Sequence, residues 1–114
     1  MLYRLAEVAD WQQTQQTGFF ASADLAAEGF IHSSERHQIL DTARRYYAGR
    51  AELVLLEWDE DALAAAGVRV EREWVASRQQ HFAHIFGPVP LAAVRRAWPF
   101  GASAQGEFGL PEGL

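Results

Sequence analysis

The sequence predicts a single domain of the α+β class. Apolar alternation typical of strands and apolar spacing typical of helices follow one another in a mixed order, as that class requires. The chain has 114 residues, near the commonest domain size, and it shows no repeat or linker. The hydrophobic fraction of 49% argues against disorder. We therefore expect one domain over residues 1–114.

The first third of the chain predicts one strand and two short helices. Residues 2–8 are apolar with alternation, which predicts the strand. The helices are expected over 9–18 and 22–29, because each run ends in a glycine that can close a helix. Asp10 is the candidate cap of the first helix.

The strongest helix is expected over residues 35–49. Its apolar residues recur at helical spacing and form one stripe, Ile39, Leu40, Ala43, Tyr46 and Tyr47. A brief strand at 30–34 precedes this helix, and Ser33 or Ser34 is expected to cap it. Gly49 stands where a terminating glycine belongs.

The rest of the chain predicts four strands, one helix and a tail. Residues 51–59 are apolar on both faces, which predicts a central strand covered on both sides. A short helix capped by Asp59 should follow. The other strands are expected at 68–74, at 81–90 running into a turn, and at 91–100. The Gly-rich tail, about 101–114, is expected to be irregular or loosely packed.

The charge of the chain limits its partners. All ten basic residues are arginine, against fifteen Asp and Glu, which gives a formal net charge of −5. That balance argues against a nucleic-acid-binding protein, which needs a basic surface for the phosphates. A local arginine cluster could still hold one phosphate-bearing small molecule, because the guanidinium group suits phosphate oxygens.

Cysteine usage and apolar runs limit the compartment. The chain has no cysteine, so it has neither disulfides nor thiol chemistry. No signal-peptide pattern is visible at the N-terminus, and no apolar run approaches the length of a membrane span. We expect a cytoplasmic protein with no membrane partner.

His32, Ser33 and Ser34 form the first candidate site. A histidine at a strand end can bond a substrate hydroxyl or act as acid or base, and the following helix start can hold an anion. The alternative is a buried histidine bonded to the backbone, followed by serines that only cap the helix. The residues themselves leave both interpretations open.

His81 and His84 form the second candidate site. They lie three residues apart, so on a strand their side chains point to opposite faces. We expect one histidine to be packed inward and the other to be exposed. The spacings among the four histidines of the chain match no zinc motif, so no metal is expected.

Glu71 and Glu73 form the third candidate site. Two residues apart on a strand, they share a face, and paired glutamates can stabilise an oxocarbenium-like centre in ribose chemistry. Close by, Ser77 and Arg78 offer a hydroxyl and an anion-binding group. The alternative is two glutamates on the solvent side of an edge strand and an ordinary polar loop.

Several motifs occur in one order along the chain. They are an early tryptophan at Trp11, a glycine–aromatic pair at Gly18, and the blocks EGFIHSS, ELVLLEWD and FAHIFGPVPLAAV. In this combination the chain resembles the small bacterial family catalogued as domain of unknown function 952, from Tyr3 to about Phe100. The family is grouped with the ADP-ribosyltransferase-like fold. The resemblance therefore implies a split core of two small, roughly perpendicular sheets, short flanking helices, and a cleft between the sheets that binds NAD.

The resemblance also implies site residues. The candidates at matching positions are His32 with Ser33 and Ser34, His84 with Phe86, and Arg4 on the first strand. The chain departs from the family at Ala83, where a proline is usual, and at Phe86, where a tyrosine is usual, so a phenolic hydroxyl is missing.

Three functions are compatible with these residues. The first is a nucleotide-ribose enzyme of the ADP-ribosyltransferase type with NAD as substrate. In it His32 orients the ribose or nicotinamide, Glu73 or Glu71 stabilises the cationic sugar, and the other candidates line the cleft. The second is a module that binds a nucleotide or another small anion without turning it over. The third is a structural or interaction protein.

Overall fold

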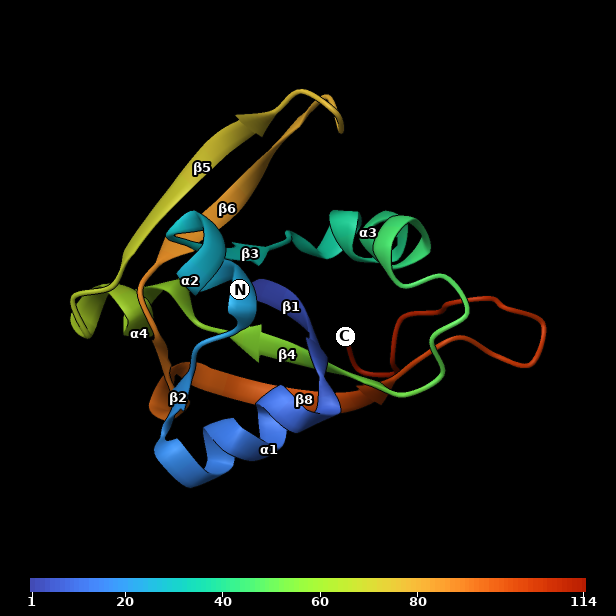
Figure 1. Cartoon of the computed structure of the whole chain (residues 1–114), viewed down its shortest axis with the longest axis horizontal. Helices are drawn as coiled ribbons and strands as arrows, with labels where there is room; N and C mark the ends of the chain where they lie inside the picture. Colours follow the sequence, from blue (N-terminus) through green and yellow to red (C-terminus); the bar gives the residue numbers. More distant parts are fainter.

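The computed structural model describes all 114 residues and contains two three-stranded antiparallel sheets (Figure 1). The first sheet has the order β1 (Leu2–Glu7), β4 (Leu53–Trp58), β8 (Val94–Phe100). The second has the order β3 (Ile31–Ser33), β6 (Gln80–Phe86), β5 (Arg69–Val75). An antiparallel bridge between Tyr3 and Ser34 joins β1 to the end of β3.

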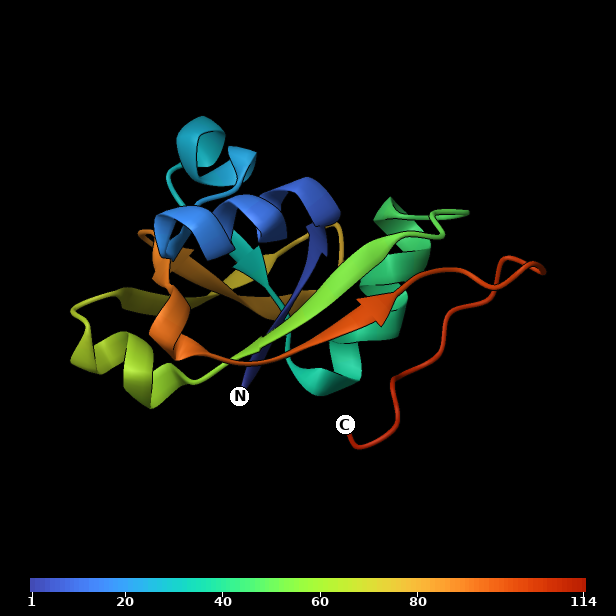
Figure 2. The same ribbon diagram turned by 90° about the horizontal axis from the view of Figure 1, so that it is seen from below.

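Short helices surround the sheets. They are α1 (Val8–Thr17), α2 (Ala23–Glu28), α3 (Ile39–Tyr46) and α4 (Glu60–Ala65), with 3-10 turns at Arg36–Gln38 and Leu91–Ala93. Helix α1 packs on β1 and β4, and α3 packs on β1 (Figure 2). The α+β class with small antiparallel sheets is confirmed. None of the helices combines the length and the apolar character needed to cross a membrane.

A two-stranded ladder of β2 (Phe19–Phe20) and β7 (Val89–Pro90) was not expected from the sequence. Two residues are too few to show a strand period. The ladder divides the strand expected at 81–90 into β6 and β7, separated by the turn at Gly87, and the strand expected at 91–100 begins only after a 3-10 turn.

Two clusters of buried residues form the core. One lies between the sheets, with Leu56 and Trp58 of β4 against Ile31 and Ile85 of the second sheet. The other lies on the opposite face of the first sheet, where Leu55 packs with residues of α3 and of the tail. All six residues of β4 are buried, so the prediction of a central strand covered on both faces is confirmed.

The helix ends agree with the sequence in part. Gly18 and Gly29 adopt the left-handed conformation at the ends of α1 and α2, and the Asp59 carboxylate accepts from two backbone amides at the start of α4. The prediction that Asp10 caps α1 is wrong. The helix begins at Val8 with no loop after β1, so Asp10 lies inside its first turn.

The start of α3 also differs from the prediction. Glu35 and Gln38 form a reciprocal capping box around the 3-10 turn, so neither Ser33 nor Ser34 is the cap. The Ser33 hydroxyl donates to the carbonyl oxygen of Ala83 at 3.1 Å, and Ser34 is paired through its backbone. The helix also ends at Tyr46, before Gly49.

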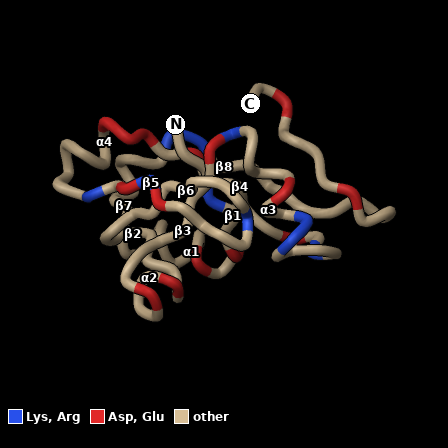
Figure 3. Tube along the Cα trace, turned by 90° about the horizontal axis from the view of Figure 1, so that it is seen from above, with Lys and Arg blue, Asp and Glu red and all other residues tan.

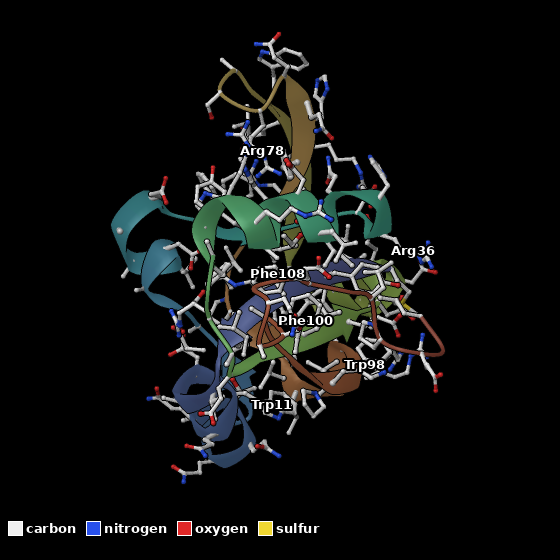
Figure 4. The ribbon with its side chains drawn as sticks, turned by 90° about the vertical axis from the view of Figure 1, so that its right-hand side faces the viewer. Trp11, Arg36, Arg78, Trp98, Phe100 and Phe108 are labelled. Atoms are coloured by element: carbon white, nitrogen blue, oxygen red, sulfur yellow. The ribbon has the colours of Figure 1, made fainter.

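The C-terminal tail has no helix or strand, yet it is packed on the second core cluster. The Phe108 ring stacks on Phe100 with centroids 5.6 Å apart, and Figure 4 shows the two side chains together. Arg36 and Arg96 donate to the carbonyl oxygens of Leu114 and Gly113. The tail is therefore irregular, as expected, but it is not loose.

Candidate active site

A cleft of about 700 Å³ is lined by residues of β1, β3, β5, β6, α1, α2 and α3 and of the turn between β5 and β6. Its wall is the face of the second sheet that points away from the core between the sheets. Strand period explains this division, because Ile31 and Ile85 enter the core while His32 and His84 take the other face. The sheet therefore presents its polar side chains to the cleft.

His32 and His84 are direct partners across β3 and β6. Their rings meet edge to face, with centroids 5.4 Å apart. The His32 side chain is 49% exposed, whereas that of His84 is only 7% exposed. His81, on the opposite face of β6, is exposed, as the strand period predicts.

His84 is held by Glu73 from the neighbouring strand. Its Nδ1 lies 2.8 Å from Oε1 of Glu73, and because a carboxylate only accepts, Nδ1 carries the proton. The Phe30 ring stacks on the imidazole at 4.0 Å between centroids. The other ring nitrogen, Nε2, is buried and has no hydrogen-bond partner in the protein. Buried polar atoms are rarely left in this state, so Nε2 is an unsatisfied atom in the cleft wall.

His32 is held by Asp24 of α2. Its Nδ1 and its backbone nitrogen lie 2.8 and 2.9 Å from Oδ2 of Asp24, which also accepts from Arg4 at 2.6 Å. Burial would raise the pKa of the Asp24 carboxyl, but the hydrogen bond with His32 and the charge of Arg4 outweigh burial and hold this pKa well below its usual range. Glu28 is 3.6 Å from Nε2 of His32. Both imidazoles are therefore oriented by carboxylates.

Arg78 lies between the β5–β6 turn and α3 (Figure 4). Its side chain is 4% exposed and its guanidinium lies over the Phe82 ring. Nη2 donates to Asp41 and to Thr42, each at 2.9 Å, while Nε is buried without a partner. Besides the unpaired acceptor Nε2 of His84, the cleft thus contains a buried donor that the protein does not satisfy.

The structure brings some of the predicted site residues to the cleft and leaves others outside. Those that line it are Arg4, His32, Ser33, Ser34, Arg78 and His84. Glu73 contacts the cleft only through His84. The Arg69 guanidinium covers the Phe86 ring and lies 3.5 Å from Glu71, and Ser77 is exposed in the turn.

Sequence reasoning missed Asp24, Glu28 and the tyrosines of α3. Asp24 belongs to α2, and nothing in the pattern predicts that this helix folds back over β3. Tyr46 was assigned to the apolar stripe of the helix, but it is 60% exposed and lines the cleft with Tyr47. Tyr46 follows Ala43, the last buried residue of α3, and this place at the end of the helix indicated that its side chain could be exposed.

Residues 5–97 match the protein-family model described as "Protein of unknown function (DUF952)". The chain belongs to the DUF952 family.

Solved structures share the fold of this DUF952 chain. The chain is similar to the crystal structure of protein CC0527 from Caulobacter crescentus, with a TM-score of 0.82, 28% identity, and coverage of 95% of this chain and 92% of that one. Against the solution NMR structure of CC0527 the TM-score is 0.72 at 32% identity, over 92% and 88% of the two chains. A comparison with curated proteins finds no match. The function therefore rests on the chemistry of the cleft.

Proposed function

We propose that this DUF952 protein binds a nucleotide ligand of the NAD or ADP-ribose type in the cleft. The observation that carries the proposal is His84, a buried imidazole whose Nε2 has no partner in the protein and whose ring forms the cleft wall beside His32. The sugar hydroxyls of such a ligand both donate and accept hydrogen bonds. They therefore suit a neutral imidazole nitrogen and the adjacent carboxylates.

The size and lining of the cleft support a ligand of this class. Small-molecule sites occupy about 300–1,000 Å³ and combine apolar walls with a few oriented polar groups. This cleft has about 700 Å³ and carries the aromatic rings of Phe30, Phe82 and Tyr47 beside its histidines and arginines. The resemblance to the ADP-ribosyltransferase-like fold is consistent with a nucleotide, and that fold assignment is part of the proposal.

A second candidate is transfer or hydrolysis of the ADP-ribosyl group of NAD. One observation favours it, namely that Glu28 lies in the cleft 3.6 Å from His32. In the reaction the bond between C1′ of the ribose and nicotinamide breaks, and its electron pair leaves with nicotinamide. Water or an acceptor hydroxyl then adds to C1′ and releases a proton, while Glu28 stabilises the positive charge on the ribose. In this role Glu28 takes the place expected for Glu71 or Glu73, because neither of those residues lines the cleft.

The binding proposal is tested by titrating NAD and ADP-ribose into the protein by calorimetry. The His32→Ala variant should weaken binding by up to about tenfold, since one hydrogen bond is worth up to about that much. His81→Ala is the matched control, because His81 is exposed on the opposite face of the same sheet. Absence of binding to the unmodified protein would contradict the proposal, as would equal losses in the two variants.

The catalytic candidate is tested by measuring release of nicotinamide from NAD. Glu28→Gln should lower the rate by about 10²-fold, the usual effect of removing one electrostatic stabiliser. Glu52→Gln, an exposed change outside the cleft, should leave the rate unaltered. If the unmodified protein binds NAD and releases no nicotinamide, the protein is a binding module only.

A further inference from the structure

The two ends of the cleft differ in charge. The end near α1 and α2 has the carboxylates of Glu7, Asp10, Asp24 and Glu28, and Figure 3 shows the acidic positions of α2 together. The opposite end, which we call the hairpin end, consists of Thr42, Tyr46, Trp74, Val75 and Arg78. It has one charged group, the Arg78 guanidinium.

Arg78 is costly to bury and is incompletely paired. A buried charge is expected to have partners for its polar atoms. Both hydrogen bonds of this guanidinium come from Nη2, so Nε and Nη1 have no partner in the protein, and Nε is fully covered. A guanidinium with free N–H donors beside a cleft is suited to an anionic oxygen.

Asp41, the counter-ion of Arg78, lies outside the cleft and does not cancel the positive charge that Arg78 brings to it. Asp41 is 51% exposed, lies outside the cleft, and is shared with Arg45 at 3.5 Å. The other cleft arginine, Arg4, differs because its partner Asp24 is 13% exposed and is itself part of the cleft wall. Solvent therefore screens Asp41 much more than Asp24.

One exposed aromatic ring adjoins Arg78. Tyr46 of α3 is 60% exposed and lines the hairpin end, with its ring centroid 5.6 Å from the Arg78 guanidinium. The Trp74 ring instead packs against His81 on the opposite face of the sheet. An exposed ring beside a cationic group offers a stacking surface to a planar ligand group.

We infer that the hairpin end of the cleft is an anion subsite in which Arg78 binds a phosphate or carboxylate of the ligand. The carboxylates at the α2 end repel that group, so the ligand lies with its anionic group at Arg78 and its hydroxyl-bearing part at His32 and Glu28. This orientation rests on the proposed function, since both concern the same cleft, but the subsite itself can be tested without a nucleotide.

The first experiment follows the Arg78 Nε–H signal by NMR during titration with inorganic phosphate and, separately, with acetate at constant ionic strength. A saturable shift of this signal is expected with at least one anion, and the two arms distinguish a phosphate from a carboxylate subsite. Asp41→Asn should lower the apparent Kd of that anion by about threefold or more, because the counter-ion of Arg78 is removed. The subsite is overturned if neither anion shifts the signal saturably in either protein.

A second experiment tests the orientation. Arg78→Gln should weaken the binding of ADP-ribose by about tenfold or more. It should weaken the binding of adenosine by less than about twofold, since adenosine has no anionic group. Arg44→Gln, an exposed change on helix α3, should alter neither affinity. Equal losses for both ligands overturn the orientation. A saturable phosphate shift together with no ADP-ribose binding overturns the proposed function and leaves the anion subsite intact.

Discussion

His32 and His84 both have an Nδ1 that is bonded to a carboxylate, while Nε2 of His32 faces Glu28 at 3.6 Å and Nε2 of His84 has no partner. Asp24 and Glu73 come from different elements, yet each lies 2.8 Å from its histidine. A carboxylate on Nδ1 fixes both the tautomer and the ring orientation, which is how proteins prepare an imidazole for proton transfer or hydrogen bonding. The two oriented rings therefore meet in one cleft.

Asp24 predicts a pH dependence of stability. Its pKa is lower in the folded chain than the ordinary value of 3.8, so its interactions stabilise the fold above pH 4 and are lost as the pH falls below that value. Asp24→Asn should lower the free energy of unfolding at pH 7 by about 2 kcal/mol. Urea unfolding at pH 7 and pH 3 measures this difference, which should shrink at the lower pH. An equal loss at both values would contradict the assignment.

The sequence predicted the histidines of the cleft better than their partners. The block GFIHSS and the strand period of HFAHIFG placed His32 and His84, because both signals are local. Asp24 and Glu28 contact the cleft through the packing of α2, which no local pattern encodes. The serines were misassigned as caps because the capping box of Glu35 and Gln38 begins only one residue later.

At the scale of elements, β1, β4 and β8 are joined by a buried polar network. Glu57 of β4 is 3% exposed, accepts from the Tyr3 hydroxyl at 2.8 Å, and accepts two hydrogen bonds from Arg96, each at 3.0 Å. Burial and the hydrogen bond to Glu57 raise the pKa of Tyr3 to about 12. A charged residue in an otherwise apolar central strand is thereby satisfied from both neighbouring strands.

This network predicts how the tyrosine titrates. Glu57→Gln removes the negative charge beside Tyr3, so the pKa of Tyr3 should fall from about 12 towards its ordinary value of 10, although burial will still hold it above 10. Phenolate absorbance between pH 9 and pH 13 follows the change, with Tyr3→Phe identifying the signal. In the unmodified protein this raised pKa stabilises the fold below pH 10, and the contribution is lost above that value. An unchanged Tyr3 titration in Glu57→Gln would refute the coupling.

The element boundaries show where sequence patterns are sufficient. The central position of β4 followed from its apolar residues on both faces, because only a doubly covered strand tolerates them. The ladder of β2 and β7 could not be predicted, since each of its strands has two residues and its pairing depends on distant parts of the chain.

At the scale of the molecule, the tail closes the second core cluster. Phe108 is 9% exposed and packs with Phe100 over the first sheet, on the face that also receives α3. Tails rich in glycine are usually loose, and the ordered path here follows from one aromatic contact and two arginines that hold carbonyl oxygens.

Phe108→Ala should therefore lower the free energy of unfolding by about 3 kcal/mol, the usual effect of removing a buried phenyl ring. Urea unfolding followed by tryptophan fluorescence measures the loss. Phe19→Ala is the matched control, because Phe19 is 53% exposed and its loss should change stability by less than about 0.5 kcal/mol. Similar losses in the two variants would show that the tail adds nothing to the core.

Strand β5 lies at the edge of the second sheet, and most of its residues are exposed. An open strand edge invites pairing with another chain and so favours aggregation, which alternating charges discourage. Arg69, Glu71, Arg72 and Glu73 supply those charges. Glu73 therefore has two roles: its carboxylate orients His84, and its charge discourages the strand edge from pairing with another chain. An apolar replacement of Glu73 would remove the hydrogen bond that orients the His84 ring and would also favour self-association of the chain at this edge.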